Sequence, residues 1–358
     1  MKSIRTRIMV LIGGIAIIAI LLSGIIVTNR VSNAIVGDEE DLVGLTTKNV
    51  AAKVDEYFTN YIATADAMAS DYSVRGFLAT VPSRDEIKTN GYYTGAYNTL
   101  ADIMAKDSDI LSAFVAVYGK DVAFDGGDWI ADAGYDLTTR DFWFADSADL
   151  EKGYIITEPY QDVDTGSMVV TVSIPVYAFD NSTIIGVAAI DITIDKLSAN
   201  VVNAERLYAD TSHIVMASAL TGTILATENE KNLLKTINDA GYGEEAVAEV
   251  SKPTGEVIKF EDEGVDSVGA VSAANTVPWS VMLVIEKGSF MDVTKDMENT
   301  LIITYLVVLV ILFIAIFIVS KSIVAPIKKL AGITEELADG NLEADIDINS
   351  QDETGQLA

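Results

Sequence analysis

The chain has 358 residues, of which 53 are Asp or Glu and 24 are Lys or Arg, for a formal net charge of −29 at pH 7. This acidity argues against a nucleic-acid partner, because neutralising phosphates requires clustered Lys and Arg. The absence of Cys excludes disulfides and thiolate metal sites, and a single His excludes a centre with several His ligands. Half of the residues are hydrophobic, which excludes a disordered chain. We expect neither a cofactor nor a metal ion.

Two uncharged segments of 19 residues each concentrate the apolar residues, at Met9–Val27 and Leu301–Val319. At 1.5 Å per residue each forms roughly 28 Å of helix, close to the ~30 Å hydrocarbon core of a bilayer. A cleaved signal peptide is the alternative for the first segment. Its apolar run is longer than such peptides usually have, and no small-residue cleavage site follows it. We therefore predict transmembrane helices at 9–27 and 301–319.

The charges beside these two segments predict their orientation. Three basic residues precede the first and three follow the second: Lys2, Arg5, Arg7, Lys321, Lys328 and Lys329. Under the positive-inside rule residues 1–8 and 320–358 are cytoplasmic, and residues 28–300 lie outside. This outer segment holds 45 acids and 18 bases, a net charge of −27. The sequence thus predicts a multi-pass protein of the cell (inner or cytoplasmic) membrane with an acidic extracytoplasmic domain.

Within the outer segment, helical spacing of apolar residues and the lack of Pro predict a long helix over residues 28–80. Short apolar runs between turn residues then predict two sets of strands. They lie at 110–118, 168–177 and 183–194, and in a smaller module at 213–219, 223–227, 256–260, 266–272 and 279–286. The fold class is α+β, with one long helix and two α/β modules, 81–207 and 208–288, built on antiparallel sheets.

Three smaller features complete these local predictions. Asp180-Asn181-Ser182 is a turn between two strands. Asp195 is the N-cap of a short helix that runs to about Arg206, and residues 230–248 form a helix.

Asp191 is the most informative carboxylate, because it lies within the apolar run 184–194. Period-two alternation places it on one face of a strand with the small residues Val187 and Ala189, and places isoleucines on the other face. A buried carboxylate without a partner costs several kcal/mol, so Asp191 requires a cation or several donors. An internal Lys, Arg or set of backbone amides is one solution, and a ligand ammonium is the other.

Arg140 lies among aromatic residues, with Phe142, Trp143 and Phe144 directly after it. A guanidinium framed by rigid apolar walls forms a planar clamp for an anion. The alternative is an internal ion pair with Asp136 or Asp141. Together, an arginine and a buried carboxylate would form a pocket polarised for a zwitterion such as a free amino acid.

Three stretches, YDLTTRDFWFADS, GYIITEPYQDVDTGSMVVTVSIPVY and GVAAIDITIDKL, resemble the membrane-distal module of the double Cache (dCache) sensor domains of bacterial chemoreceptors and sensor kinases. The resemblance covers residues 35–290 by layout and is strongest within 135–195. It implies two PAS-like Cache modules, of which the membrane-distal one binds the ligand.

Site residues follow from this resemblance position by position. In members that bind amino acids, a Tyr, an Arg and a Trp hold the carboxylate, and two Tyr and an Asp hold the ammonium. Tyr135, Arg140, Tyr160 and Asp191 match in type and order. Phe142 stands where the family has Trp, and Trp143 stands where it has Tyr, so the carboxylate end loses an N–H donor. Amines, small carboxylates and nucleobase-like ligands therefore stay open beside amino acids.

At the C-terminal end, residues 322–337 carry apolar side chains at heptad spacing, which suits a parallel helix partner. Gly340-Asn341 interrupts this stripe, and Asp352-Glu353-x-Gly355 follows. The segment 320–358 resembles an incomplete HAMP linker. That resemblance implies a homodimer that passes a membrane signal to an output domain.

These features predict a transmembrane methyl-accepting chemotaxis receptor that senses a small extracellular molecule. Its expected partners are a ligand, a second copy, and a cytoplasmic histidine kinase with its coupling protein. A sensor histidine kinase with the same sensor and a tethered surface hydrolase are the alternatives, and the residues after Ala358 would separate receptor from kinase. We interpret Asp162-Val163-Asp164-Thr165-Gly166 as a solvated hairpin rather than a calcium loop, and His213 as structural. The smaller module shows no comparable set of ligand-binding residues.

Overall fold

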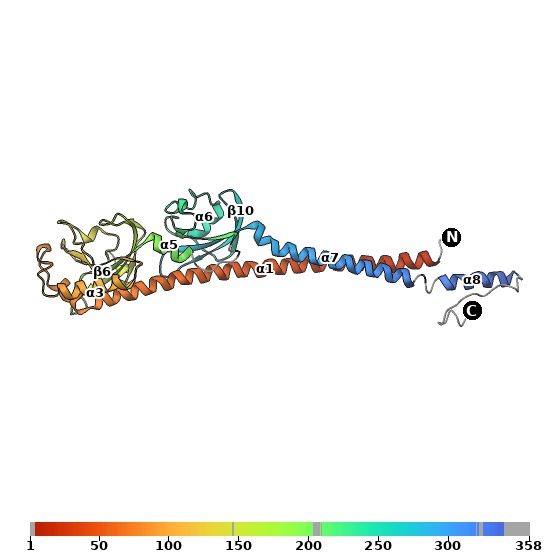
Figure 1. Cartoon of the computed structure of the whole chain (residues 1–358), viewed down its shortest axis with the longest axis horizontal. Helices are drawn as coiled ribbons and strands as arrows, with labels where there is room; N and C mark the ends of the chain where they lie inside the picture. The colour runs from red at the N-terminus through yellow and green to blue at the C-terminus, as the bar shows by residue number, and fades with distance from the viewer. Residues whose placement is uncertain are drawn as a thin grey trace. The chain divides into compact units, whose positions relative to one another are not determined.

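The computed structural model of the chain describes residues 4–144, 147–202, 208, 210–319, 321 and 325–339. The fold separates into two compact units, one formed by residues 1–38 with 291–358 and the other by residues 39–290. Two long helices, α1 (Ile4–Ser70) and α7 (Lys287–Val319), contribute residues to both units (Figure 1).

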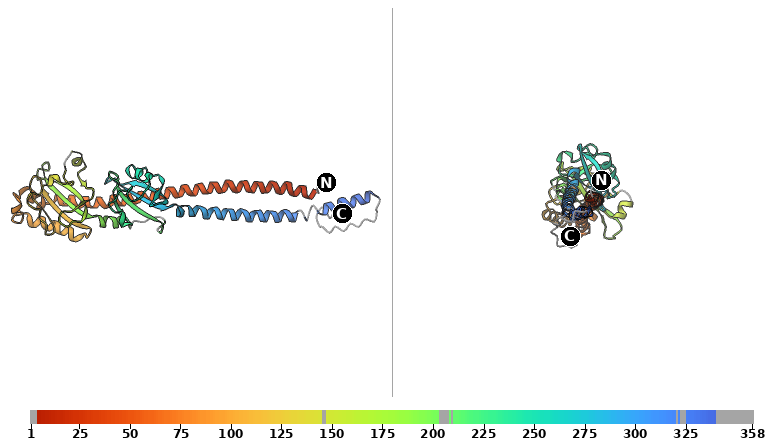
Figure 2. Two further views of the ribbon diagram at one scale, coloured as in Figure 1. Left: turned by 90° about the horizontal axis from the view of Figure 1, so that it is seen from above. Right: turned by 90° about the vertical axis from the view of Figure 1, so that its right-hand side faces the viewer.

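In the first unit, the N-terminal part of α1 and the C-terminal part of α7 pack side by side in antiparallel directions (Figure 2). The contacts pair Gly13 with Ile316, Gly24 with Tyr305, and the Ser32 hydroxyl with the Glu298 carboxylate at 2.9 Å. Both helices contain a stretch long and apolar enough to cross a membrane. Their large apolar side chains are exposed, as expected of surfaces that face lipid rather than protein. The helix α8 (Ala325–Ala338) also belongs to this unit, whereas residues 340–358 lie outside the described chain.

The second unit contains a first sheet whose strands are ordered β2-β1-β6-β5-β3, with β4 beside β5. All of its pairings are antiparallel. The strands are β1 (Ile110–Val117), β2 (Ala123–Asp125), β3 (Ile155–Ile156), β4 (Tyr160–Gln161), β5 (Met168–Tyr177) and β6 (Ile184–Thr193). The three long predicted strands are thus confirmed, and β2, β3 and β4 complete the sheet. We refer to this sheet and the helices packed on it as the first-sheet module.

The hairpin that joins β5 to β6 has the predicted turn. The Asp180 carboxylate accepts hydrogen bonds from the backbone N–H groups of Ser182 and Thr183, both at 2.9 Å. Asn181, directly after Asp180, has a φ of 56°, in the left-handed region that Asn tolerates. This turn aligns β5 with β6 and therefore places Thr171 opposite Asp191.

Helices cover one face of the first sheet. They are α2 (Tyr72–Thr80) and α3 (Tyr93–Lys106), which follow α1. The Phe77 ring of α2 meets Phe124 of β2 edge to face, with the centroids 4.8 Å apart. The opposite face carries small residues and a group of aromatic rings, and includes Ala116, Ala123, Val187 and Ala189. Short helical segments, η2 (Leu137–Thr139), α4 (Ser147–Lys152) and η1 (Arg84–Glu86), lie in the connections.

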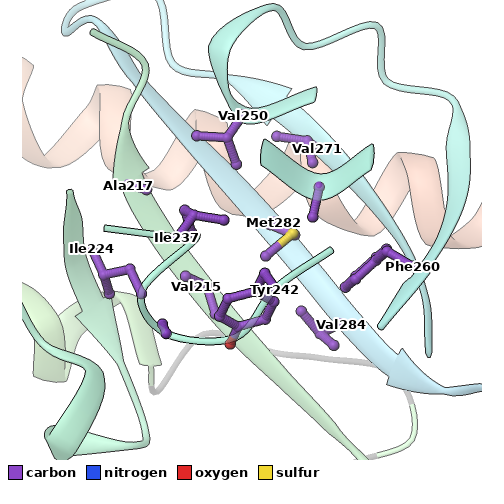
Figure 3. Close-up of a cluster of buried hydrophobic side chains, with 12 residues drawn as sticks. Val215, Ala217, Ile224, Ile237, Tyr242, Val250, Phe260, Val271, Met282 and Val284 are labelled. Carbon is purple, nitrogen blue, oxygen red and sulfur yellow. The ribbon is translucent and has the colours of Figure 1, made fainter. Parts of the chain in front are cut away.

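The second sheet has the order β8-β7-β11-β10-β9 and is also antiparallel. Its strands are β7 (Ser212–Ser218), β8 (Ile224–Thr227), β9 (Val257–Asp262), β10 (Val265–Ala273) and β11 (Trp279–Glu286). One face packs its apolar side chains, such as Val215 and Met282, against α6 (Glu244–Ser251) and residues 237–242 (Figure 3). On α1, the Phe58 ring contacts Trp279 of β11 at 5.1 Å. We refer to this part as the second-sheet module.

The predicted fold class is therefore confirmed: a long N-terminal helix precedes two antiparallel sheets. Three local predictions are wrong. The long helix predicted over 28–80 ends at Ser70, because the Asp71 carboxylate accepts hydrogen bonds from the N–H groups of Ser73 and Val74 and so caps a separate helix, α2. Asp195 is not an N-cap, because β6 passes directly into α5 (Ile194–Val202) and Asp195 lies in the first turn; the predicted continuation over 203–207 lies outside the described residues.

The prediction of a helix over residues 230–248 is also wrong. Only η3 (Glu230–Asn232) and the first part of α6 are helical there. Backbone groups of Leu234 and Lys235 bond to Ile224 of β8 instead, and Leu234 and Gly241 have φ values of 65° and 90°. A right-handed helix cannot include residues with such dihedral angles.

Gly186 is required where β6 pairs with β1, because a Cβ at this position would lie 2.2 Å from the Ala116 carbonyl oxygen. We expect Gly186→Ala to force these strands apart and to lower the free energy of unfolding by about 1–3 kcal/mol. Urea unfolding of the whole chain followed by fluorescence measures this change. Gly91→Ala is the matched control, since nothing lies within 4 Å of a Cβ at that position. Equal effects of the two substitutions would contradict the assignment.

Candidate ligand-binding site

A hollow opens on the face of the first sheet opposite α2 and α3. Its described lining includes polar and aromatic residues: Leu111, Ser112, Phe114, Asp125, Trp129, Tyr135, Arg140, Phe142, Tyr160, Asp162, Val163, Asp164, Thr165 and Asp191. The volume of the hollow is about 460 Å³ when counted out to its mouth. Within it, the centres of water-sized groups can occupy a volume of about 50 Å³. One such group needs about 10–15 Å³, so the hollow admits a ligand of only a few heavy atoms without rearrangement.

Asp191 lies at the base of the hollow, on the central strand β6, and is 3% exposed. Its Oδ1 accepts a hydrogen bond from the Thr171 hydroxyl at 2.5 Å and a longer one from the Tyr160 hydroxyl at 3.4 Å. The Tyr160 and Thr171 hydroxyls are themselves 2.5 Å apart. No Lys or Arg of the described chain lies within ion-pair distance of Asp191. The internal cation considered from the sequence is therefore not what holds this carboxylate.

Burial dominates the electrostatics of Asp191. Removal from water raises its pKa to about 7, although the hydroxyl of Thr171 opposes this shift by hydrogen bonding to the charged form. Burial also raises the pKa of Tyr160, and the nearby Asp191 adds to that effect, so Tyr160 keeps its proton as a donor. A cation in the hollow would favour the charged form of Asp191 and return its pKa toward the ordinary range.

Arg140 follows η2 and lies beside Tyr135, with its guanidinium carbon 5.6 Å from the centroid of the Tyr135 ring. In the described chain it makes no salt bridge with Asp136 or Asp141. Asp136 instead accepts hydrogen bonds from the backbone and hydroxyl of Thr138. The guanidinium therefore retains its capacity to bind an anion in the hollow.

The two positions that depart from the family pattern lie in different places. Phe142 is 2% exposed, packs edge to face on Phe114 with the centroids 5.2 Å apart, and lines the hollow. Trp143 stacks on Tyr118 with a 4.8 Å centroid separation and a 12° interplanar angle, and it does not line the hollow. The structure thus brings together five predicted site residues, Tyr135, Arg140, Phe142, Tyr160 and Asp191, and leaves Trp143 outside.

Several lining residues were not predicted. Asp125 ends β2 and is 8% exposed; its Oδ1 accepts hydrogen bonds from the N–H groups of Gly127 and Trp129, and burial raises its pKa. The signal available was the Asp-Gly-Gly sequence after an apolar run, which is typical of a turn rather than of a site. Thr171 carried no signal, because its contact with Asp191 depends on the register of β5 against β6.

The segment 162–165 forms one wall of the hollow. Asp162 Oδ2 accepts hydrogen bonds from the backbone N–H groups of Asp164 and Thr165 at 3.2 and 2.7 Å, and Gly166 closes the turn with a φ of 70°. These bonds hold a hairpin turn between β4 and β5, the turn that the sequence predicts. Its unforeseen feature is that Asp162 and Asp164 face the ligand hollow.

A larger hollow, of about 920 Å³ when counted out to its mouth, lies in the second-sheet module. Its described lining contains five carboxylates and His213, whose Nε2 lies 3.1 Å from the Tyr242 hydroxyl and 3.5 Å from Asp262. No Lys or Arg occurs among these described lining residues. The pairing of a guanidinium with a buried carboxylate is therefore a feature of the first hollow.

Comparison with known families places this arrangement in context. Residues 28–292 match the Cache domain family (dCache_1), and residues 318–358 match the HAMP domain family. Because the first match covers most of the chain, the protein belongs to the Cache domain family.

Among characterised relatives, the methyl-accepting chemotaxis protein McpC of Bacillus subtilis is 23% identical over 363 residues, which cover 99% of this chain and 51% of McpC. The chain thus spans about half the length of this relative.

Two solved ligand-binding domains share the fold. That of the Pseudomonas aeruginosa amino acid chemoreceptor PctC, solved with GABA, has a TM-score of 0.51 and 21% identity, and the match covers 69% of this chain and 99% of that one. That of the Pseudomonas fluorescens chemoreceptor CtaA, solved with L-isoleucine, has a TM-score of 0.55 and 15% identity, and the match covers 73% and 98% of the two chains.

The raised pKa of Asp191 predicts how stability depends on pH. The folded chain keeps this proton up to about pH 7, whereas the unfolded chain releases it near the ordinary value of 3.8. Asp191 therefore contributes a free energy of unfolding that falls as pH rises from about 4 to 7, with a slope of at most about 1.4 kcal/mol per pH unit. Urea unfolding at several pH values should show that Asp191→Asn removes this slope. An unchanged slope in Asp191→Asn would contradict it, and the exposed Asp85→Asn is the control.

Proposed function

We propose that this chain is the sensing and transmembrane part of a chemoreceptor that binds a small amino acid or amine in the hollow of its first-sheet module. The bound molecule changes a conformational equilibrium that the second membrane helix passes to the HAMP segment. The observation that carries this proposal is the presence in one hollow of an arginine that makes no salt bridge with any described residue and a buried carboxylate whose donors among the described residues are hydroxyl groups.

The charges of the hollow favour a ligand with an ammonium group. Its described lining contains four carboxylates, those of Asp125, Asp162, Asp164 and Asp191, and one guanidinium, that of Arg140. An amine would relieve the desolvation of Asp191, and Arg140 would bind the carboxylate of an amino acid. The relatives support this class, since PctC is described as an amino acid chemoreceptor and CtaA was solved with L-isoleucine.

The proposal includes a division of the chain into working parts. Residues 1–8 and 320–358 are cytoplasmic, residues 9–27 and 301–319 cross the cell membrane, and residues 28–300 form the extracytoplasmic sensor. Within it, residues 28–80 contain the outer part of the long helix α1 and the separate helix α2, residues 81–207 form the membrane-distal ligand-binding module and residues 208–288 the membrane-proximal module. The two apolar helices, the Cache match and the HAMP match support this layout.

The proposed partners follow from the same comparisons. Methyl-accepting relatives and the HAMP match support a homodimer that controls a cytoplasmic histidine kinase through a coupling protein. The protein would therefore bind its ligand without converting it. Recovery of the bound molecule unchanged after prolonged incubation would support this point, and turnover would support the hydrolase alternative.

Ligand binding is tested by thermal-shift and calorimetric screening of the chain in detergent with L-amino acids, GABA, amines and short carboxylates. Asp191→Ala should weaken the binding of any ligand found by about 30-fold or more, because it removes the partner of a buried ammonium. Arg140→Gln should weaken amino acids strongly and amines without a carboxylate little. Asp85→Asn should leave binding unchanged. Undiminished binding to Asp191→Ala would show that the ligand lies elsewhere.

Proton release provides an independent test of the ammonium contact. Below pH 7 the empty site holds a proton on Asp191, and an ammonium ligand must displace it. Calorimetry at pH 6 in buffers of different ionisation enthalpy should therefore show release of up to one proton, which disappears above pH 8. Affinity should rise by up to tenfold per pH unit as pH approaches 7. Asp191→Asn should abolish both effects, and buffer-independent heats at pH 6 in the unmodified chain would contradict the contact.

A further inference from the structure

A buried hydrogen-bond route leads from the base of the hollow toward the second-sheet module. Thr171, which donates to Asp191, is fully buried and pairs with Thr157 through two further bonds. The Thr171 N–H donates to the Thr157 hydroxyl at 3.0 Å, and the Thr157 N–H donates to the Thr171 carbonyl at 3.1 Å. Thr157 is 3% exposed, so water does not compete for these bonds.

The next residue in the chain continues this route. The Glu158 carboxylate accepts a hydrogen bond at 3.2 Å from the indole N–H of Trp279 in the second-sheet module. Trp279 is 1% exposed and is the first residue of β11. β11 ends at Glu286, and α7 begins at the following residue, Lys287.

Two neighbouring contacts join the same segments. Lys152 and the hydroxyl of Tyr154 both donate to the carbonyl of Thr276, in the loop between β10 and β11, at 3.3 Å. From α1, the Asp55 carboxylate holds this loop through the N–H groups of Asn275 and Thr276, both at 2.7 Å. The loop is therefore anchored to α1 on one side and to the first-sheet module on the other.

We propose that Glu158 and Trp279 form the coupling contact between the ligand site and the strand that leads into α7. A change in the charge or partner of Asp191 alters its bond with Thr171, and the paired backbones of Thr171 and Thr157 transmit that change to Glu158. This inference rests on the proposed function, which supplies the ligand that would change the charge or partner of Asp191.

The physical requirement is an element with two arrangements that both ends of the route can bias. The Tyr160 and Thr171 hydroxyls meet this requirement, because either can donate to the other. When Asp191 is charged, its carboxylate attracts the hydroxyl proton of Thr171. When Asp191 is protonated or paired with a cation, this attraction weakens, and the Thr171 hydroxyl can donate to Tyr160 instead. Glu158 is a positioning residue in this scheme and lines no part of the hollow.

Hydrogen–deuterium exchange of the whole chain in nanodiscs tests the route without any ligand. At pH 8, where Asp191 is largely charged, Asp191→Asn should change the exchange rates of amides in residues 279–286 at least threefold. In a Glu158→Ala background the same substitution should change them less than 1.5-fold. Glu158→Gln retains an acceptor for the indole and should restore the threefold effect. Trp279→Phe, which keeps an aromatic ring and removes the donor, should behave as Glu158→Ala does.

Asp55→Ala is the matched control, because it removes a contact with the same loop from outside the route. The effect of Asp191→Asn should persist in that background, since independent sites act additively. A full effect of Asp191→Asn in the Glu158→Ala background, or no effect in any background, would overturn the coupling role. Ligand binding is measured separately, so its failure would reject the proposed function, whereas additivity with binding intact would reject this inference alone.

Discussion

The desolvation of one carboxylate, that of Asp191, organises the first-sheet module. Asp191 lies on the central strand of the first sheet, where both neighbouring strands and the aromatic face exclude water. Because the charged form of a buried carboxylate is costly, its surroundings must supply protons, donors or cations. Among the described residues, the hydroxyls of Thr171 and Tyr160 donate hydrogen bonds to it, and the charge of Arg140 acts on it without an ion pair. A cationic group in this hollow would therefore lower the electrostatic cost of the charged carboxylate.

Much of this site could be predicted because its main signals are local. Alternation within a single strand placed Asp191 on the small-residue face, and the run of aromatics after Arg140 indicated an anion clamp. The contacts of Thr171 and Trp129 were not predictable, since they depend on which residues of separate strands and loops meet. Trp143 shows the same limit: Phe142 before it lines the hollow, but the Trp143 ring stacks on Tyr118.

The errors in secondary structure have a related cause. Residues 230–248 have the composition of a helix, yet the bonds of residues 234 and 235 to β8 and the positive φ at Leu234 are set by tertiary contacts. The three long strands of the first sheet and the strands of the second were predictable because each contains an apolar run between turn residues, whereas the short strands β2, β3 and β4 were not predicted. The long helix was predictable because the helical spacing of its apolar residues repeats over many turns.

The segment around Arg140 has a consequence for affinity. Leu137 before it and Phe142 after it are buried, and Trp143 is stacked on Tyr118, so the backbone that carries the guanidinium is fixed on both sides by apolar packing. The conformational entropy of ordering this segment is lost when the protein folds, not when a ligand arrives. An anion that reached this arginine would therefore retain most of the favourable energy of the contact.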